Sequence, residues 1–481
     1  MQSHKLTTPL EHVEICVIGG GPAGSTVAHR LAQLGHDVCL IERNSFPRFH
    51  VGESLAPSIL SLLELLGLRQ EFLDAGFDQP GHAIVHWGGK KEIVESDGFV
   101  IDRSRFDQLL LAKSRNAGVR VLQPASAEKP VRRENGDWLI PVVADRRRFF
   151  VAARFLVDAA GRCGSIGGKR VRLSAPTLAL SGHWTGSRGG RSLRIEAGER
   201  HWYWGASRPD RTFDATLFVD PGDCREHWGV GAVREFYLER IAKSVLLRKC
   251  LHGAIPLNLG SFASNASRAS DPVSHHHVKV GEALLAVDPL SAQGVVLAIS
   301  SGLQAAIVVH TLLSSSASNG GDPAAAIEFY CQRSAEAAAR QQKLAATEYA
   351  REAEVRHTSF WTERAAVAGV IRGPAASPNE VSATMSLERR VSLASEAAVR
   401  RVACVRDEVV AWMGAVVHPT MDRPVAYFDG VELAPLLEIV KSLPQPPTMG
   451  AVLHAWSAKV PDHVKRRLAE WLVRHGIMIM G

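Results

Sequence analysis

Apolar and polar positions at the start of the chain predict a strand, a helix and a second strand. Residues 13–18 read VEICVI, a β-branched run typical of a buried parallel strand. A helical pattern follows over residues 25–34 and ends at Gly35, and a second apolar run occupies residues 37–41. Strands that alternate with helices form parallel sheets, so we expect an α/β domain at the amino terminus.

The middle of the chain has a different pattern. Short apolar runs alternate there with glycine, proline and arginine, as strands of antiparallel sheets do: residues 178–181, 192–195 and 214–219. We expect a separate domain with an antiparallel sheet over residues 171–270, which residues 80–100 can join. Residues 1–170 and 271–370 then form one discontinuous α/β domain.

The last third of the chain is richer in helical patterns. Residues 322–364 are rich in alanine and predict one long helix, and residues 373–378, GPAASP, predict a linker. We expect a small α+β domain over residues 371–481, with Thr448 as a helix cap. Three helices and a terminal strand are predicted in it, a winged-helix-like order: residues 401–412, 433–442, 464–475 and 477–480.

Residues 289–309 are the stretch of the chain that most resembles a membrane-spanning segment. They carry no formal charge and approach the length that spans a bilayer. Several serines, glutamines and a glycine interrupt them, so we predict a buried helix and no membrane contact. No small-residue cleavage site follows the first apolar run, so we predict no signal peptide.

Composition narrows the function classes. The chain has 481 residues, enough for roughly two to four domains that each bury a core. Its 7 cysteines form no CxxC pair, which favours a reducing, cytoplasmic compartment. The net charge of +7 makes an anionic partner, such as an acidic protein, easier to attract, and a soluble enzyme without such a partner can be equally basic. Basic residues are scattered without interleaved aromatic residues, so we expect no nucleic-acid binding.

A glycine-rich motif links the first strand to the first helix. Residues 19–24 read GGGPAG, a GxGxxG sequence, and Glu42 follows the second strand. In this motif Gly19 allows a tight turn, Gly21 leaves room for a pyrophosphate, and Gly24 lets the helix approach the strand. The helix start attracts the phosphates, and Glu42 can accept hydrogen bonds from an adenosine ribose. We therefore predict a dinucleotide site.

Four further segments match one family of flavoproteins. They are FPRFHVGESL at 46–55, DRSRFD at 102–107, FLVDAAGR at 155–162, and GEA with DPLSAQGV between 281 and 295. With the glycine motif they resemble the superfamily of FAD-dependent tryptophan halogenases and geranylgeranyl reductases. The chain looks closest to the flavoprotein monooxygenases of tryptophylquinone cofactor biogenesis. Glu282 is a departure, because the family usually has aspartate there.

The resemblance implies a fold and an FAD site. The fold is the FAD-binding two-dinucleotide fold of glutathione reductase-like, hydroxylase-type proteins, with the antiparallel substrate domain and the small carboxy-terminal module appended. The residues expected to bind FAD are Gly19, Gly21, Ala23, Gly24, Glu42, Arg43, Gly52, Arg103, Asp158, Glu282, Pro289, Gln293, Gly294 and Val295. Backbone N–H groups near Gly294 would face the flavin with a helix dipole behind them.

Two comparisons within the family bear on halogenation. Halogenases carry a WxWxIP segment, and here Trp202 and Trp204 are present without the Ile-Pro pair. Halogenases also need a lysine near the substrate. Residues 78–87 contain none, and Lys90 and Lys91 follow a Trp-Gly-Gly turn. Halogenation therefore becomes the weaker interpretation.

Hydroxylation is the activity that the resemblance then implies. A flavin C4a-hydroperoxide, formed with O2, would hydroxylate an aromatic side chain, a tryptophan in a protein or peptide. No second nucleotide motif is visible, so NAD(P)H would visit transiently or a separate reductase would supply electrons. We expect Glu53 and His50 to handle protons. The expected substrate pocket contains His82, His86, Trp202 and Trp204.

Other interpretations stay open. The same motifs occur in reductases or oxidases of small or isoprenoid molecules, in halogenases, and in flavin-binding accessory proteins with low turnover. A metal enzyme is not expected: of the three consecutive histidines, only His275 and His277 would share a strand face, without an acidic or thiol ligand beside them. The sequence carries no signal for an oligomeric state.

Overall fold

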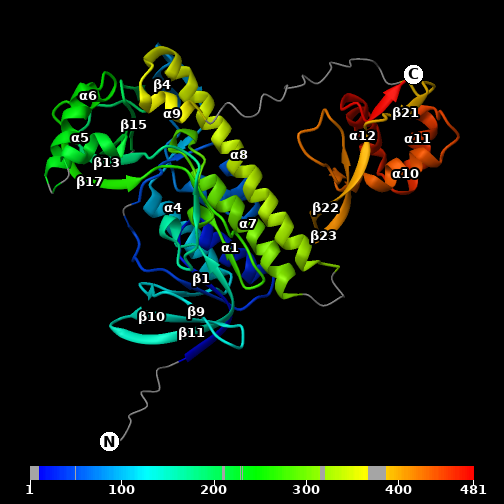
Figure 1. The fold of residues 1–481 in the computed structure, drawn as a ribbon, viewed down its shortest axis with the longest axis horizontal. Helices are drawn as coiled ribbons and strands as arrows, with labels where there is room; N and C mark the ends of the chain where they lie inside the picture. The colour runs from blue at the N-terminus through cyan, green and yellow to red at the C-terminus, as the bar shows by residue number, and fades with distance from the viewer. Residues whose placement is uncertain are drawn as a thin grey trace, which may run out of the picture. The chain divides into compact units, whose positions relative to one another are not determined.

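Figure 1 shows a mixed α/β protein. The structure is a computed structural model that describes residues 10–48, 50–208, 212–227, 229, 231–314, 320–366 and 386–481. Its contacts divide the chain into two compact units. The first unit contains Met1–His310 and Tyr330–Ile371, and the second contains Thr311–Phe329 and Arg372–Gly481.

A largely parallel sheet forms the base of the first unit. Its strand order is β7-β2-β1-β11-β10-β8, with β19 paired to β11 and β9 paired to β10. The parallel pairs in this sheet are β7–β2, β2–β1, β1–β11 and β11–β19. Strand β10 is antiparallel to β11. The bounds are β1 Leu10–Ile18, β2 Val38–Ile41, β7 Arg120–Leu122, β8 Ser126–Ala127, β9 Val131–Arg132, β10 Trp138–Ala144, β11 Arg147–Asp158 and β19 His277–Lys279.

Helices pack on this sheet. Helix α1 (Pro22–Gln33) contacts α4 (Arg103–Asn116), and α7 (Gly294–Leu313) lies close to α1 in Figure 1. The predicted strand, helix and second strand at the amino terminus are confirmed. Shorter elements of the unit are α2 Ile59–Leu65, α3 Arg69–Asp74, β3 Ser54–Leu55, β6 Phe99–Val100, β12 Arg170–Arg172, β18 Ser267–Ala269 and β20 Leu285–Ala286.

A second sheet has the order β17-β13-β16-β15-β14-β4-β5. It is antiparallel except where β14 pairs with β4. The three predicted strands of the middle region are present in it as β13, β14 and β16. The bounds are β4 Gly81–Trp87, β5 Lys90–Ser96, β13 Leu178–Thr185, β14 Leu193–Ala197, β15 His201–Ser207, β16 Thr212–Val219 and β17 Ile255–Ala263.

Helices cover both faces of the second sheet. Helices α5 (Ala232–Lys243) and α6 (Leu247–Cys250) share a core with Leu180, Phe213 and Leu217. On the other face Trp202 stacks on Phe218 at a centroid distance of 3.7 Å. That face packs against α8 (Pro323–Arg356) and α9 (Ser359–Ala365) through Tyr349 and Trp361.

Helix α8 is bonded to both sheets of the first unit. The Tyr330 hydroxyl donates to the carbonyl of Lys279, at the end of β19. Further along α8, Trp87 Nε1 donates to the carbonyl of Glu348, and Glu352 accepts from the N–H of Gly88. The predicted single helix to residue 364 is wrong at its end. The chain leaves the helix at His357, where φ is 47°, and α9 follows.

In the second unit, one segment predicted as a helix is a hairpin of two strands. Residues 401–412 belong to a hairpin of β22 (Ala398–Arg406) and β23 (Val409–Val417), which turns at Asp407 with φ of 56°. The segment is rich in valine, and valine favours strands because its branched side chain is restricted in a helix. The predicted linker at 373–378 lies outside the described residues.

Three other predicted elements of the second unit are confirmed. They are α10 (Ala434–Ser442), α12 (Asp462–Arg474) and the terminal strand β26 (Met478–Met480). Thr448 caps α11 (Met449–Ala455) by accepting from Ala451 N. Strand β26 pairs with β21 (Val391–Leu393), and β24 (Tyr427–Phe428) pairs with β25 (Val431–Glu432).

Helix α7 is long and apolar enough to cross a membrane by length and composition. However, 67% of its most apolar window is buried inside the protein. Burial of this kind is typical of a core helix, as the sequence predicts.

The stacked Trp202 provides a test of this core. Trp202 is 1% exposed, so we expect Trp202→Ala to lower the free energy of unfolding by about 3–5 kcal/mol, because it leaves a cavity. Trp204→Ala is the matched control, because that side chain is only partly buried and should cost less. Chemical denaturation followed by far-ultraviolet circular dichroism measures both. Equal losses would contradict the burial assigned to Trp202.

Candidate flavin and substrate site

The turn after β1 requires two glycines. Gly19 has φ of +111°, and a Cβ there would lie 2.3 Å from the carbonyl oxygen of Ala159. A Cβ on Gly24 would lie 1.8 Å from the carbonyl oxygen of Gly19. Helix α1 therefore packs against the strand end as the GxGxxG motif predicts. Ala23, between the motif glycines, is buried.

Glu42 holds this turn from the neighbouring strand. Its carboxylate accepts from the N–H of Gly20 at 2.7 Å and from that of Asn44 at 2.8 Å. Arg48 Nη1 donates to it at 3.2 Å. Each carboxylate oxygen can accept more than one hydrogen bond, so these contacts leave capacity for a ribose hydroxyl. Arg43 follows at the surface.

The start of α1 is suited to a phosphate group. Gly21 is its N-cap, and no side chain caps the helix. A Cβ on Gly21 would meet only the end of the Arg48 side chain, at 3.4 Å. Helix N–H groups without a side-chain acceptor attract an anion, and Arg48 adds a positive charge beside them.

Buried ion pairs hold the segment of residues 47–53. Arg103 donates to both oxygens of Asp107, at 3.0 and 3.1 Å, and to the carbonyl of Val51 at 2.7 Å. Arg48 also reaches Asp107, at 3.3 Å. Because Arg103 and Asp107 are buried, each needs the other to compensate its lost hydration.

Two acidic residues on the other side of the turn have structural partners. Asp158 is buried and accepts from the N–H groups of Ala160, Ser165 and Ile166, so it orders the loop after β11. Glu282 accepts from Arg162 Nε at 3.1 Å, with its side chain 41% exposed.

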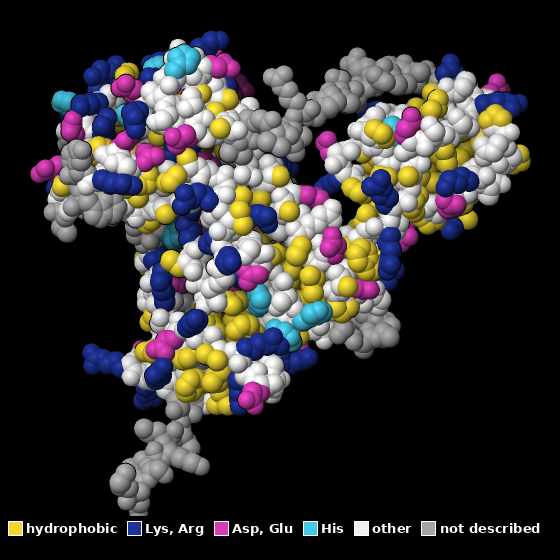
Figure 2. Space-filling view, viewed as in Figure 1, with side chains coloured by type: hydrophobic (Ala, Val, Ile, Leu, Met, Phe, Trp, Pro, Cys, Tyr) yellow, Lys and Arg dark blue, Asp and Glu magenta, His cyan; other side chains and the backbone are white. Residues whose placement is uncertain are grey.

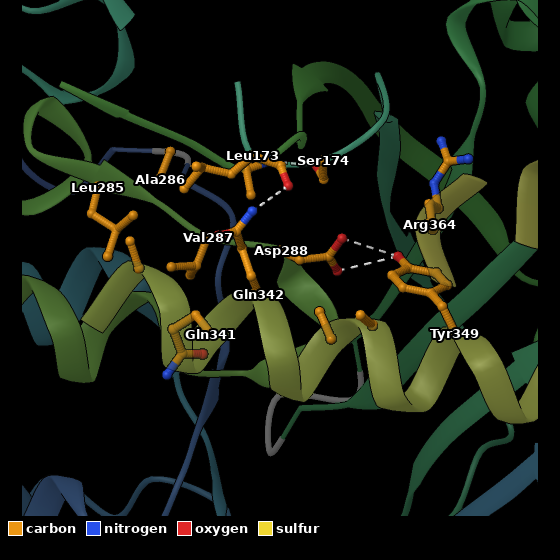
Figure 3. Close-up of a pocket in the computed structure, with 14 residues that line it drawn as sticks. Leu173, Ser174, Leu285, Ala286, Val287, Asp288, Gln341, Gln342, Tyr349 and Arg364 are labelled. Carbon is orange, nitrogen blue, oxygen red and sulfur yellow. Dashed lines mark hydrogen bonds between the residues drawn. The ribbon is translucent and has the colours of Figure 1, made fainter. Parts of the chain in front are cut away.

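Asp288 orders the loop before α7. It accepts from Leu290 N at 3.0 Å and from the Tyr349 hydroxyl, and Figure 3 shows both carboxylate oxygens facing that hydroxyl. Burial raises the pKa of Asp288 to about 6. Pro289 begins the following short turn, and the chain reaches α7 through the predicted FAD residues Gln293, Gly294 and Val295.

Figure 3 also shows the small cavity beside Asp288. Its volume is about 20 Å³, which is room for one or two water molecules. Gln341, Tyr349 and Arg364 contribute polar atoms to its lining. The space is too small for a flavin or a substrate, so we interpret it as part of the packing behind the Asp288 loop.

A larger polar cavity lies beside the segment of residues 47–53. It has a volume of about 210 Å³. The residues that line it are polar except for one proline. They belong to loops beside the first sheet and to the second sheet, and they are Pro47, Arg48, His50, Asp102, Ser104, His183 and Arg208.

Glu53 is buried near Arg208, one of the residues that line this cavity. Its Oε2 accepts from the N–H of Gly52 at 2.9 Å, while its Oε1 has no hydrogen-bond partner among the residues that the structure describes. Arg208 Nη2 lies 4.0 Å from that oxygen. Burial, followed by the nearby charge of Asp214, raises the pKa of Glu53 to about 7, against the opposing effect of Arg208. A carboxyl group with this pKa exchanges protons readily near neutral pH.

His50 lines the cavity next to Glu53. Its Nδ1 lies 2.8 Å from the carbonyl oxygen of Val51. Burial, and then the positive charge of Arg103, lower the pKa of His50. Of the two predicted catalytic residues, His50 is partly buried and lines the cavity, while Glu53 is buried three residues further along the chain, and their roles stay predictions.

The predicted substrate pocket is not assembled as expected. His82 is exposed on β4, and His86 lies on the same strand. Trp202 lies in the core described above, with Trp204 packed at its margin. The lining of the polar cavity contains none of the four.

Sequence reasoning missed His183, Arg208 and Asp214. Asp214 was open to detection, because it is a charged residue inside the apolar strand β16. For His183 and Arg208 no local signal stands out, because the pairing of strands brings them to Asp214.

The next feature of the described residues is the grouping of metal-ligating side chains. Among them, no group of three or more His, Cys, Asp or Glu side chains could hold a metal ion. His277 has a nearby acidic residue, Asp271, at 4.0 Å, but Lys279 binds that carboxylate at 2.8 Å.

Comparison with known proteins finds similar flavin-dependent enzymes. A family model described as tryptophan halogenase matches residues 14–96. A tryptophan 2-halogenase of Chondromyces crocatus is 29% identical over 401 residues, which cover 77% of this chain and 75% of that protein. A flavin-dependent halogenase of Armillaria mellea is 28% identical over 340 residues, or 61% of this chain and 65% of that protein.

Solved structures agree over nearly the whole chain. A peptidyl tryptophan dihydroxylase, QhpG, essential for tryptophylquinone cofactor biogenesis, is 26% identical with a TM-score of 0.73, covering 97% of this chain and 99% of that one. These similarities support a relationship to the FAD-dependent halogenase-like superfamily. The flavin-dependent halogenase CmlS has the same fold as this chain. Its TM-score is 0.74 at 20% identity, over 98% of this chain and 96% of that one.

The flavin-dependent relatives and structural neighbours indicate that the protein is an FAD-dependent oxidoreductase. The residues present fit FAD. The helix start at Gly21 has space and no side-chain cap, and Glu42 stands at the end of the adjacent strand. Glu53 adds a buried oxygen without a hydrogen-bond partner in the described part of the chain.

Two glycine variants separate cofactor binding from folding. Gly21→Val should abolish FAD binding, because its side chain would occupy the phosphate position, while the fold has room for it. Gly24→Ala should destabilise the fold itself, because its Cβ meets backbone. Flavin absorbance after reconstitution and thermal unfolding of the apoprotein measure the two effects. A yellow, stoichiometric Gly21→Val protein would refute this placement.

Glu53→Gln tests the raised pKa through stability. The native carboxyl has a pKa of about 7 against an ordinary 4.5, so between these values the folded state holds a proton that the unfolded state releases. The wild-type free energy of unfolding therefore decreases as pH rises through this window, and the penalty is complete above pH 7. We expect Glu53→Gln to become more stable relative to wild type from pH 5 to pH 8, as measured by denaturant unfolding. A difference that does not change with pH would contradict the assignment.

Proposed function

We propose that the protein is an FAD-dependent monooxygenase that hydroxylates an aromatic side chain, a tryptophan in a peptide or protein. The observation that carries this proposal is the lack of a lysine in strand β4 and just before it. Residues 78–87 contain no lysine, and the next lysines, Lys90 and Lys91, are exposed on β5. A residue of the kind that halogenases use near the substrate is therefore lacking at this position. The similarity to the peptidyl tryptophan dihydroxylase over 97% of the chain supports the proposal.

Halogenation is the second candidate. The family model and the two relatives described above carry halogenase names. Halogenases and hydroxylases of this fold both need reduced flavin, so the fold alone does not favour either one. The oxygen or halogen content of the product distinguishes them.

The buried side chains would support oxygen transfer in specific ways. When bound and reduced, FAD activates O2 and supplies one oxygen atom to the substrate ring. The cradle of Gly19, Gly21 and Glu42 would orient the cofactor. Glu53, with a pKa near 7, would accept the proton that the substrate ring carbon loses. Burial of Glu53 would limit the access of bulk water to its carboxyl group.

The reductant and the partner complete the proposal. A separate reductase or a transiently bound NAD(P)H would reduce the flavin. On the face drawn in Figure 2, basic, acidic and apolar side chains are interspersed. An extended peptide with mixed chemistry fits such a surface better than a nucleic acid does, because a nucleic acid needs clustered positive charge.

Mass spectrometry tests the proposed function. The protein is reconstituted with FAD and incubated with a flavin reductase, NADH, isotopically labelled O2, chloride and bromide, and a tryptophan-containing peptide. We expect the peptide to gain labelled oxygen on the indole ring. Gly21→Val, which should not bind FAD, is the control for uncatalysed oxidation. Halogen incorporation without oxygen would overturn the proposal in favour of a halogenase.

A further inference from the structure

Strand β17 leaves one edge of the second sheet open. It ends the strand order of that sheet, and its only partner strand in the described part of the chain is β13. Figure 1 shows β17 at the margin of the sheet. An edge strand presents unpaired backbone N–H and C=O groups, which can pair with an extended segment of another chain.

The side chains at the start of β17 are apolar and exposed. Ile255 is 64% exposed and Leu257 is 59% exposed. Pro256 lies between them, and the pairing with β13 shifts its register here, so pairing with another chain is hindered along this first part. Residues 258–263, NLGSFA, contain neither a charge nor a proline. The later part of the edge therefore lacks these protections against a further strand.

The open strand lies beside the polar cavity. Asn258 is opposite His183 on β13, and its side-chain oxygen accepts from the N–H of His183 at 3.3 Å. Ile255 is opposite Thr185. Thr185 and His183 are two positions apart on β13 and project to the same face of the sheet. Their opposite residues on β17 project to that face as well, so the exposed Ile255 shares a face with a residue that lines the cavity.

Basic side chains accompany the start of β17. Arg248 and Lys249 are exposed on α6, shortly before the strand, and Arg188 is exposed in the loop after β13. The N–H of Arg188 donates to the carbonyl of Cys250 at 2.8 Å, so this loop adjoins α6. None of the three basic side chains has an ion pair among the residues that the structure describes.

The sequence around these residues lacks acidic side chains. Residues 184–195 and 240–270 contain no aspartate or glutamate. The segments that form this end of the sheet therefore carry only positive charge, and they complement an acidic ligand.

These features favour an acidic peptide over two other partners. A second copy of this chain would bring its own β17, whose surrounding segments are basic, so like charges would face each other. A nucleic acid is anionic, but it has no strand edge to pair with the backbone of residues 258–263. It also lacks aliphatic side chains to cover Ile255 and Leu257.

We propose that β17 docks an extended, acidic segment of the peptide substrate as an additional strand of the second sheet. The inference rests on the proposed hydroxylation, because it names the partner of that reaction. Backbone groups of residues 258–263 would pair with the segment. Ile255 and Leu257 would contact its apolar side chains, and Arg248 and Lys249 would attract its carboxylates.

The proposed position brings the peptide close to the candidate site. Neighbouring strands of a sheet lie about 4.8 Å apart. The added strand would therefore run roughly 10 Å, or two strand spacings, from the backbone of His183. Residues of the peptide that flank the paired segment would then reach the polar cavity.

The first test measures binding without turnover. The probe is a fluorescent peptide of about ten residues, enough to span β17, with a central tryptophan between alternating glutamates and valines. Fluorescence anisotropy gives its affinity for the full chain. We expect bound peptide to slow amide hydrogen exchange in residues 255–263, while β5, the opposite edge of the sheet, should not change. No binding, or binding without slower exchange in β17, would overturn the docking site.

Leu257→Asp tests the apolar contact. The side chain is exposed in the free protein, so the fold should tolerate the change, and we expect the peptide affinity to fall by roughly 10-fold or more. Ile93→Asp is the matched control on β5, where Ile93 is 72% exposed. It adds the same charge and should bind the peptide as wild type does. Equal losses in the two variants would contradict docking on β17.

Charge reversal tests the preference for an acidic peptide. We expect Arg248→Glu combined with Lys249→Glu to lower the affinity by roughly 10-fold at low salt, and the effect should decrease as salt screens it. Arg146→Glu combined with Arg147→Glu changes the net charge equally at the exposed turn between β10 and β11. If this control loses as much affinity, net charge explains the binding and the proposed local attraction is wrong.

Turnover separates the two proposals. If wild type binds the peptide along β17 but transfers no oxygen to it, the proposed hydroxylation fails and the docking of an acidic peptide stands. We expect Leu257→Asp to raise KM for the peptide and to leave kcat unchanged, because β17 would bind the peptide equally before and during the reaction. If wild type hydroxylates the peptide and Leu257→Asp has the same kcat/KM, the docking site is wrong.

Discussion

The parallel pairing of β1 with β2 and β11 is the constraint on which the site depends. Ile18 lies opposite Ile41 on one side and Asp158 on the other. Because the carboxyl ends of parallel strands meet at one edge of a sheet, this register brings together three chain segments that are far apart in sequence. Gly19, Glu42 and Asp158 then order the loops at that edge. A shift of one residue would separate Glu42 from the Gly20 N–H.

Buried charge has two different roles around this edge. Arg103 and Asp107 compensate each other and bind the segment that precedes Glu53, so their charges stabilise a loop conformation. Glu53 has a raised pKa and one oxygen without a hydrogen-bond partner among the residues that the structure describes, which is unfavourable for stability above neutral pH. The stable ion pairs thus fix the backbone that keeps an unfavourable carboxyl group in place, a combination that occurs at functional sites.

The sequence predicts those parts of the site that depend on local pattern. The spacing of the glycines in the GxGxxG turn and the apolar runs of the two strands beside it are compatible with only a few local structures. Residues 401–412 form part of the hairpin at Asp407, where the pattern predicts a helix, because a short apolar run is compatible with either a helix or a strand. The group of His183, Arg208 and Asp214 depends on the register of β13 with β16, which no local pattern specifies. Likewise, alternation places Trp202 and Trp204 on one face of β15, but the burial of that face depends on α8 and α9, much later in the chain.

Helix α8 has a consequence for how the first unit can move. One uninterrupted helix is bonded near its start to the end of β19 and near its end to the β4 and β5 turn. A helix of this kind resists bending, so hinge closure between the two sheets would have to break its contacts. Entry of a large ligand would therefore depend on rearrangement of short loops, because α8 holds the two sheets together.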